Sequence, residues 1–303
     1  MRLALIIGLG IQGNKRSIIL KRLKIKYLTL DPLNKYADYK NIKEIPNKIL
    51  NEISHIFLCT PYKERLNYLK FFKKQKVKIL VEKPLINDEM EKNFYLKNKK
   101  LISNKIYCAY NHRFEDCIIK LKKIIQSNKL GKLYFCNMIY GNGTAKNVRN
   151  SIWKNRNKGV VMDLMPHLLD LSKYIFKKIP NSIGKANKKK FENESIDFFE
   201  INSSIKSLNI SFNVSYLYWK NYFKIFVVGS KGYLKLEGLP KWGKTKLVYG
   251  KRKLPSGKPN IKNYWFKEKD FTWSMEIKNF IKNKFKTLDL KKEIQIYNFI
   301  KKC

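Results

Sequence analysis

The chain has 303 residues, of which 44% are hydrophobic and 14% aromatic, and this suffices to fill the cores of one large or two ordinary domains. Such a composition excludes an intrinsically disordered chain, and no apolar run in the sequence approaches the roughly 20 residues of a membrane-spanning helix. The formal net charge of +42 raises the question of a nucleic-acid partner.

The positive charge is carried almost entirely by lysine and is spread over the whole chain. A protein that reads phosphates usually favours arginine, whose planar fork binds them in a bidentate manner. Lysine, asparagine and isoleucine are enriched together, and all three have A/T-rich codons, so mutational bias accounts for the charge without a partner. We therefore expect no nucleic-acid partner, while the charge should help to attract small anions to a cleft.

The five cysteines are far apart and none forms a C-x-x-C pair, which speaks against a disulfide framework and against a zinc site. No metal ion is predicted. The short apolar start of the chain is not followed by a small-residue cleavage site, so we expect a cytoplasmic protein.

The glycine turn Gly8-Leu-Gly-Ile-Gln-Gly13 follows an apolar run at residues 3–7. A helix-like stretch at residues 14–23 and a second apolar run at 27–30 come next, and that run ends on Asp31. This order is that of a dinucleotide-binding βαβ unit, in which the glycines allow a tight turn, close approach of a pyrophosphate and close packing of the helix. The alternative is a glycine turn in another kind of α/β protein. The predicted cofactor contacts here are Gly8, Gly10, Ile11, Gln12, Gly13 and Asp31.

Strand-like and helix-like segments alternate up to about residue 114, which predicts a parallel, doubly wound sheet. Further strands are expected at residues 53–59, 77–81 and 106–110, with helices at 63–74 and 88–99 and little room for a helix within 34–48. In such sheets ligands bind beyond the carboxyl ends of the strands. Polar motifs follow these strand ends, namely Thr60-Pro61, Glu82-Lys83-Pro84 and Asn111-His112-Arg113-Phe114.

After residue 114 the pattern changes to long runs in which polar and apolar residues alternate, which is typical of an antiparallel sheet with one covered face. Such runs occupy residues 132–140, 196–205, 208–217, 222–228 and 232–237. Helices are expected at 116–127, 164–176, 273–284 and 291–301, with a surface hairpin or loop at 241–262. The sequence thus predicts a dinucleotide-binding domain over residues 1–114 and an α+β domain over residues 115–303.

Two motifs carry candidate chemistry. Lys83, at a strand end, could hydrogen-bond a substrate hydroxyl and stabilise negative charge on its oxygen; the alternative is an ordinary solvated lysine. Asp163, His167 and Asp170 are spaced so that on a helix they share one face, and histidine exchanges protons near neutral pH. The alternative is that Asp163 caps the helix, because Pro166 fits only a first turn or a kink, and that His167 packs in the core.

The other two histidines and one tryptophan admit more than one interpretation. His55 lies beside a buried strand and is expected to be structural. His112 either contacts substrate or hydrogen-bonds to backbone. Trp153 either packs on the nicotinamide or a sugar ring, or belongs to the core.

Together these motifs resemble the Gfo/Idh/MocA family of oxidoreductases, and the likeness covers nearly the whole chain. The motifs that match the family's order are the glycine turn, Thr60-Pro61, Glu82-Lys83-Pro84, Asn111–Phe114, Gly131-Lys-Leu, Trp153, Asp163-x-x-x-His167-Leu-Leu-Asp170 and Gly229-Ser-Lys-Gly232. Arg65 departs from the pattern, because members often have histidine there, and Lys158-Gly159 replaces a fuller glycine cluster.

The resemblance implies an N-terminal Rossmann domain with a doubly wound parallel sheet, and a C-terminal α+β domain with a large, mostly antiparallel open sheet through which copies associate. It implies NAD(P)-dependent hydride transfer to or from a hydroxyl or keto carbon of a sugar, cyclitol or nucleotide-linked sugar, with surface-polysaccharide precursors as the narrower expectation. By the same likeness Lys83 would polarise the substrate oxygen, His167 would transfer the proton and Asp163 would align the site. The implied cofactor contacts add Thr60, Pro61, Glu82, Lys83 and Trp153, and the implied substrate contacts are Lys83, Asn111, His112, Arg113, Asp163 and His167.

Cofactor choice depends on Asp31, whose charge would repel a 2′-phosphate. We therefore expect NAD, with NADP as the alternative because Lys35 lies nearby. A second reading of the whole chain is a non-catalytic dinucleotide-binding sensor or assembly subunit on the same fold. The presence of Lys83, Asp163 and His167 argues against it.

Overall fold

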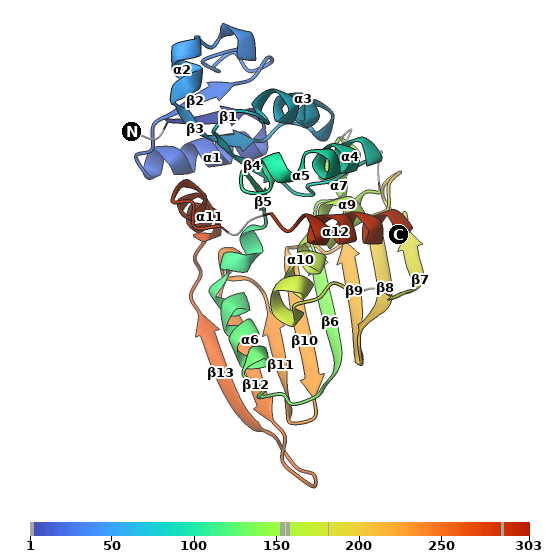
Figure 1. Cartoon of the computed structure of the whole chain (residues 1–303). Coiled ribbons are helices and arrows are strands. Elements are labelled where there is room, and N and C mark those ends of the chain that lie inside the picture. Colours follow the sequence, from blue (N-terminus) through green and yellow to red (C-terminus); the bar gives the residue numbers. More distant parts are fainter. Residues whose placement is uncertain (1–2, 152–154, 156–157, 181, 286–287) are drawn as a thin grey trace. The chain divides into compact units, whose positions relative to one another are not determined.

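The computed structural model of the chain describes residues 3–151, 155, 158–180, 182–285 and 288–303 (Figure 1). The chain divides into two compact units. The first unit consists of Met1–Ala109 and Trp273–Ile294, and the second consists of Tyr110–Thr272 and Gln295–Cys303.

The first unit contains a five-stranded sheet in the order β2-β1-β3-β4-β5, and every strand pair in it is parallel. The strands are β1 (Leu3–Ile7), β2 (Tyr27–Leu30), β3 (Ile53–Leu58), β4 (Lys78–Glu82) and β5 (Ile106–Ala109). They are apolar and buried on both faces, as the near-continuous hydrophobic runs predict. The order reverses between β1 and β3, and the carboxyl ends on either side of such a switch point are where α/β sheets bind ligands. The predicted doubly wound parallel sheet is confirmed.

The helices of the first unit connect these strands. They are α1 (Ile11–Arg22), η1 (Ile42–Glu44), α2 (Asn47–Glu52), α3 (Tyr62–Phe72), α4 (Glu89–Lys97), α5 (Lys99–Ile102) and α11 (Thr272–Ile281). The connection between β2 and β3 holds only the six-residue α2 and one 3-10 turn, so the expected short crossover is confirmed.

Helix α11 packs into the first unit, although its sequence position suggested the second domain. Ile277 and Phe280 are buried in one cluster with Ala4, Ile6 and Phe57. Phe280 makes an edge contact with Phe57 at 5.2 Å between ring centroids. The predicted division into domains at residues 1–114 and 115–303 stays a prediction.

The second unit contains an eight-stranded sheet in the order β13-β12-β11-β10-β6-β9-β8-β7, antiparallel except for the β6–β9 pair. The strands are β6 (Leu133–Gly141), β7 (Ser182–Lys189), β8 (Phe198–Ile205), β9 (Leu208–Ser215), β10 (Tyr222–Gly229), β11 (Gly232–Glu237), β12 (Thr245–Lys251) and β13 (Asn260–Phe266). This confirms the predicted large, mostly antiparallel sheet. The sequence indicated neither β7 nor the full β12–β13 hairpin, because β7 and β13 are polar edge strands without a buried apolar face.

Helices α6 (Asp116–Gln126) and α10 (Met165–Phe176) pack against one face of this sheet (Figure 1). Along β10 and β11 buried and half-buried residues alternate, so only one face is covered. The remaining elements of this part of the chain are η2 (Asn111–Phe114), α7 (Ala145–Arg149), α9 (Val160–Asp163), η3 (Pro240–Trp242) and α12 (Leu290–Lys302), the last of which begins in the first unit. Among the described helices, none combines the length and the apolar character that crossing a membrane demands.

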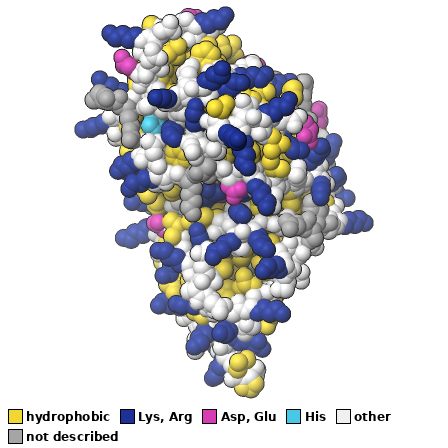
Figure 2. All heavy atoms as spheres, viewed as in Figure 1, with side chains coloured by type: hydrophobic (Ala, Val, Ile, Leu, Met, Phe, Trp, Pro, Cys, Tyr) yellow, Lys and Arg dark blue, Asp and Glu magenta, His cyan; other side chains and the backbone are white. Residues whose placement is uncertain are grey.

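Lysine and arginine side chains are scattered over the face drawn in Figure 2, with apolar and neutral surface between them. This distribution agrees with the even spread of lysine along the sequence.

Candidate functional site

The glycine turn connects β1 to α1 at the switch point of the parallel sheet. Gly8 has φ +91°, and a Cβ there would approach the backbone of Cys59 and Thr60 to 3.0 Å. A Cβ on Gly13 would lie 1.8 Å from the carbonyl oxygen of Gly8, so only glycine lets the helix pack this closely. By contrast, a Cβ on Gly10 would meet nothing within 4 Å. The backbone at Gly10 therefore faces open space, which is the room that an approaching pyrophosphate requires.

Gly10 is also the N-cap of α1, and no side chain caps the helix. The first amide groups of a helix have no partner within it, and they favour an anion at this end. The predicted contacts Ile11 and Gln12 supply two of these amides.

Asp31 lies at the carboxyl end of β2, and its carboxylate holds two loops together. One oxygen accepts the amide of Leu9 at 2.6 Å, and the other accepts those of Leu33 at 2.8 Å and Asn34 at 3.0 Å. Burial opposes the charge, but these hydrogen bonds outweigh it and lower the pKa of Asp31 below its usual value. Asp31 is thus an ionised side chain bonded directly to the glycine turn.

A pocket of about 500 Å³ lies beside this loop, within the size range of small-molecule sites. It is formed by α1, β2 and the segment that follows β2, and most of its side chains are polar. The lining residues are Leu9, Asn14, Ser17, Tyr27, Thr29, Asn34, Tyr36 and Asp38.

Thr60 and Pro61 follow β3 at the same edge of the sheet. The Thr60 hydroxyl is buried and has no hydrogen-bond partner among the described residues. A buried hydroxyl without a partner is costly unless a ligand or water satisfies it. The neighbouring Cys59 thiol stays protonated, because burial raises its pKa to about 12.

Glu82-Lys83-Pro84 begins at the last residue of β4, and two buried arginines hold it. The first is Arg16 of α1, which is fully buried and donates from Nε to the Glu82 carboxylate at 2.8 Å. Nη2 of Arg16 contacts the Glu82 carboxylate as well, and it lies 3.2 Å from the carboxylate of Glu276 on α11. The Arg16 guanidinium also lies 5.0 Å from the ring centroid of Trp273. The ion pairs therefore join α1, the end of β4 and α11.

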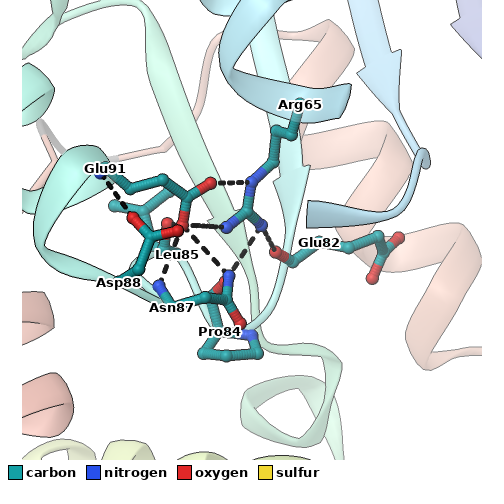
Figure 3. A network of polar contacts seen from close by, with 7 residues as sticks. All are labelled: Arg65, Glu82, Pro84, Leu85, Asn87, Asp88 and Glu91. Carbon is teal, nitrogen blue, oxygen red and sulfur yellow. Dashed lines mark hydrogen bonds and ion pairs between the residues drawn. The ribbon is translucent and has the colours of Figure 1, made fainter. Parts of the chain in front are cut away.

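The second is Arg65 of α3, whose guanidinium reaches the turn after β4 (Figure 3). It donates to the backbone carbonyls of Glu82, Pro84 and Leu85, each at 3.0 Å. It also binds the Glu91 carboxylate in bidentate fashion, at 2.9 and 2.8 Å. Burial disfavours the charge of Arg65, but Glu91 outweighs it, so the pKa of the guanidinium is raised. Arg65 thus fixes the backbone on both sides of the predicted catalytic lysine.

Asp163 ends the short helix α9, and α10 begins at Met165 after a break at Leu164. Pro166 occupies the first turn of α10, as its missing N–H requires. The alternative that Asp163 caps this helix is wrong, since Leu164 is the N-cap. The carboxylate of Asp163 is nearly buried and accepts a hydrogen bond from the Tyr216 hydroxyl at 3.1 Å.

His167 lies in the first turns of α10 within a cluster of rings. Its ring centroid is 4.4 Å from that of His112, 5.8 Å from Tyr140 and 6.3 Å from Tyr110. Burial, with Asp163 as the next contribution, raises the pKa of Tyr140. Tyr140 therefore lies near both the carboxylate and the imidazole of the predicted pair.

His112 and its neighbours in η2 make specific polar contacts. His112 Nδ1 lies 3.2 Å from the Lys241 ammonium. The Asn111 amide donates to the Thr272 hydroxyl at 3.1 Å. The Arg113 guanidinium pairs with the Asp170 carboxylate, with Nε at 2.6 Å from one oxygen.

The predicted catalytic residues are divided between the units: Lys83 belongs to the first, and Asp163 and His167 belong to the second. His55 contacts Ser54 at 2.9 Å and Phe280 edge-on at 5.2 Å, in agreement with a structural role. Trp153 lies outside the described residues. Within the described ranges, no cluster of three or more His, Cys, Asp or Glu side chains could hold a metal ion.

Sequence reasoning missed several polar residues of these clusters. They are Arg16, Glu276, Tyr216, Lys241 and Glu115. Arginine is rare in this chain, so a helical arginine next to the glycine turn was the one usable signal. Lys241 is one lysine among many.

The middle part of the chain matches a known family model. Residues 118–235 match the family model for the GFO/IDH/MocA C-terminal domain. This segment is therefore similar to the C-terminal domain of Gfo/Idh/MocA proteins. Among curated proteins none matches this chain.

Solved structures share the fold of this chain over almost its full length. An oxidoreductase from Agrobacterium radiobacter, in complex with NAD+, L-tartaric acid and magnesium, is 13% identical with a TM-score of 0.78, covering 99% of this chain and 94% of its own. A putative NADPH-dependent oxidoreductase from Desulfitobacterium hafniense is 13% identical with a TM-score of 0.81, covering 98% and 93%. Levoglucosan dehydrogenase in complex with NADH is 12% identical with a TM-score of 0.80, covering 99% and 95%. At these identities the likeness establishes the fold.

Proposed function

We propose that this chain is a member of the Gfo/Idh/MocA family and an NAD-dependent dehydrogenase that transfers a hydride between nicotinamide and a hydroxyl or keto carbon of a sugar-like substrate. The observation that carries the proposal is the glycine turn. Gly13 is sterically required for the close packing of α1, whereas Gly10 faces open space beside an uncapped helix N-terminus. Such an arrangement suits a dinucleotide pyrophosphate.

The residues present fit the dinucleotide in three places. The amides after Gly10 would bind the pyrophosphate, and the Asp31 carboxylate would accept from ribose hydroxyls with the lone pairs left by its backbone bonds. The buried Thr60 hydroxyl would gain the partner that it lacks among the described residues. The ionised Asp31 would repel a 2′-phosphate, which favours NAD over NADP.

The nicotinamide ring supplies the hydride chemistry, and the protein supplies binding, orientation and the path of the proton. In the oxidation direction His167 would take the hydroxyl proton of the substrate while the Lys83 ammonium stabilises the charge on its oxygen. Asp163, held by the Tyr216 hydroxyl, would bind a substrate hydroxyl or orient the imidazole. Asn111, His112 and Arg113 are proposed as further substrate contacts.

The substrate class is inferred from chemistry and from related structures. Solved structures of levoglucosan dehydrogenase contain its complexes with NADH and levoglucosan and with NADH and L-sorbose. The charge of +42 favours anionic molecules. We therefore propose sugars, cyclitols and nucleotide-linked sugars, with a role in polysaccharide-precursor synthesis as the narrower form.

Cofactor titration and variant kinetics test this proposal. We expect NADH to quench or shift tryptophan fluorescence at lower concentration than NADPH. Hydride transfer should follow with a member of a panel of free sugars, inositols and UDP-sugars. Lys83→Ala and His167→Ala should each lower turnover about a hundredfold or more while keeping NADH binding, and the exposed control Lys76→Ala should not. Normal turnover in both variants would contradict the assigned roles. Tight NADH binding without transfer to any compound would favour the sensor alternative.

We further propose that the open face of the eight-stranded sheet joins copies of this chain. Phe135, Phe226 and Tyr233 form a ring cluster on the half-exposed sides of their strands, with centroids 6.0 and 5.9 Å apart. Contiguous apolar surface of this kind marks an interface. Phe135→Asp should lower the molar mass measured by light scattering, and a wild-type chain that is monomeric at all concentrations would contradict this.

A further inference from the structure

His112 and His167 share one buried cluster with a lysine. The Lys241 ammonium of η3 lies 3.2 Å from His112 Nδ1, and the two imidazole centroids are 4.4 Å apart with planes tilted by 56°. His112 is 2% exposed and His167 is 8% exposed. All three residues belong to the second unit, so the cluster is defined within one compact body.

The contact with lysine fixes the chemical form of His112. An ammonium group has only hydrogen-bond donors, so Nδ1 of His112 must be the acceptor. A ring nitrogen that accepts a hydrogen bond carries no proton, and His112 is then the neutral tautomer with its proton on Nε2. Adding a second proton at Nδ1 would put two cations within hydrogen-bond distance.

Other charged and titratable groups surround this cluster. Glu115 is fully buried, has no hydrogen-bond partner for its carboxyl oxygens among the described residues, and interacts electrostatically with Lys241. Burial, against the opposing charge of Lys241, raises the pKa of Glu115 to about 7. The groups near His167 or joined to it through this cluster are His112, Lys241, Glu115, Asp163, Tyr140, Tyr110 and Tyr216.

The distance between the two rings makes their protonation competitive. Like charges at this separation in a buried site oppose each other strongly. A site that uses one imidazole for proton transfer therefore needs the other to stay neutral throughout the reaction. The hydrogen bond from Lys241 to Nδ1 keeps His112 neutral in this way.

We propose that Lys241 is a positioning residue: by donating to Nδ1 it holds His112 neutral, so that His167 is the imidazole that takes up the substrate's proton. This inference rests on the proposed function for the role of His167. The substrate O–H bond breaks as its proton bonds to a ring nitrogen of His167, and the electron pair left on oxygen forms the C=O bond. The C–H bond of the same carbinol carbon breaks, and the hydrogen with its electron pair would pass to the nicotinamide, which is the oxidant of the proposed function.

Nitrogen NMR of the histidines tests the proposal without substrate or cofactor. The chain has only three histidines, so His112→Gln and His167→Gln variants assign the signals, and His55 serves as an internal reference. In the wild-type protein we expect His112 to show an unprotonated Nδ1 from about pH 5.5 to about pH 8.5. In Lys241→Met it should take up a second proton within that range, whereas Lys241→Arg should preserve the wild-type pattern.

The matched control is Lys244→Met, which removes an exposed lysine three residues away that lies over the Trp265 ring. A proton on Nδ1 of His112 in the wild-type protein near neutral pH would overturn the proposal, and this holds even if Lys241→Met fails to fold. A Lys241→Met titration identical to that of Lys244→Met would overturn it as well.

Kinetics separates this inference from the proposed function. In Lys241→Met, kcat/KM should fall about tenfold further than in the control for each pH unit below the new His112 titration. Normal turnover in His167→Ala would contradict the proposed proton transfer, while the NMR result would still decide the state of His112.

Discussion

Replacing Arg65 by methionine tests how the turn after β4 is held. The change keeps a long apolar side chain but removes the guanidinium donors that reach the carbonyls of Glu82, Pro84 and Leu85 (Figure 3). It also leaves the Glu91 carboxylate, which is 1% exposed, without its cation. Removing one partner of a buried ion pair typically costs about 3–5 kcal/mol.

The lower end of this range is the better expectation for Arg65→Met. Asn87 still donates to the Glu91 carboxylate through its backbone amide at 2.8 Å and its side-chain amide at 3.1 Å. We therefore predict a loss of about 3 kcal/mol in the free energy of unfolding. The double variant with Glu91→Met removes both charges, and it should be at least about 1 kcal/mol more stable than Arg65→Met alone.

Urea denaturation followed by circular dichroism measures these differences on the intact chain, and hydrogen exchange of the α3 and β4 amides localises them to the first unit. Lys63→Met, at an exposed position of the same helix, should stay within about 0.5 kcal/mol of wild type. An Arg65→Met protein as stable as Lys63→Met would contradict the stabilising role of Arg65 at the turn after β4. An Arg65→Met/Glu91→Met variant less stable than Arg65→Met would contradict it as well.

Three other predictions concern the glycine turn, Asp31 and the buried Glu115. Gly13→Ala should destabilise the fold and abolish NADH binding, because its Cβ would lie 1.8 Å from the Gly8 oxygen. Gly10→Ala should leave the stability of the unliganded protein unchanged, because its Cβ would meet nothing within 4 Å. Its affinity for NADH, measured by fluorescence titration, should fall about tenfold or more. Asp31→Asn should lower the ratio of the NADPH dissociation constant to the NADH dissociation constant, because it removes the charge that would repel the 2′-phosphate. A pKa of about 7 for Glu115 means that the folded chain keeps a proton that the unfolded chain has lost. The free energy of unfolding should therefore fall between about pH 4.5 and about pH 7, and Glu115→Gln should remove this slope and add on the order of 3 kcal/mol at about pH 8.

The parallel sheet was predictable because its signals are local. Each strand is a short apolar run, and each functional motif follows a strand end directly in the sequence. The glycine turn and Asp31 are eighteen residues apart in one βαβ unit, so one pattern describes both.

Features that depend on distant contacts were not predictable. Helix α11 packs against β1 and β3, where Phe280 contacts Phe57, and nothing in its own sequence points to these partners. Edge strands β7 and β13 lack a buried face and hence the alternation that identifies a strand. The sequence does not distinguish Lys241 from the other lysines; its contact with His112 arises only in the folded chain.

Two arginines from different helices hold the same short segment, and this suggests why buried ion pairs are present there at all. Arg16 binds the side chain of Glu82, while Arg65 binds the backbone from Glu82 to Leu85. Buried ion pairs contribute little net stability compared with apolar packing, but their geometry is specific. If their role is to orient Lys83, the Arg65→Met/Glu91→Met double variant should recover stability without recovering turnover. We expect its kcat to stay at least about tenfold below wild type with NADH affinity nearly unchanged. A double variant that regains both stability and kcat would show that the ion pair of Arg65 with Glu91 serves the fold alone.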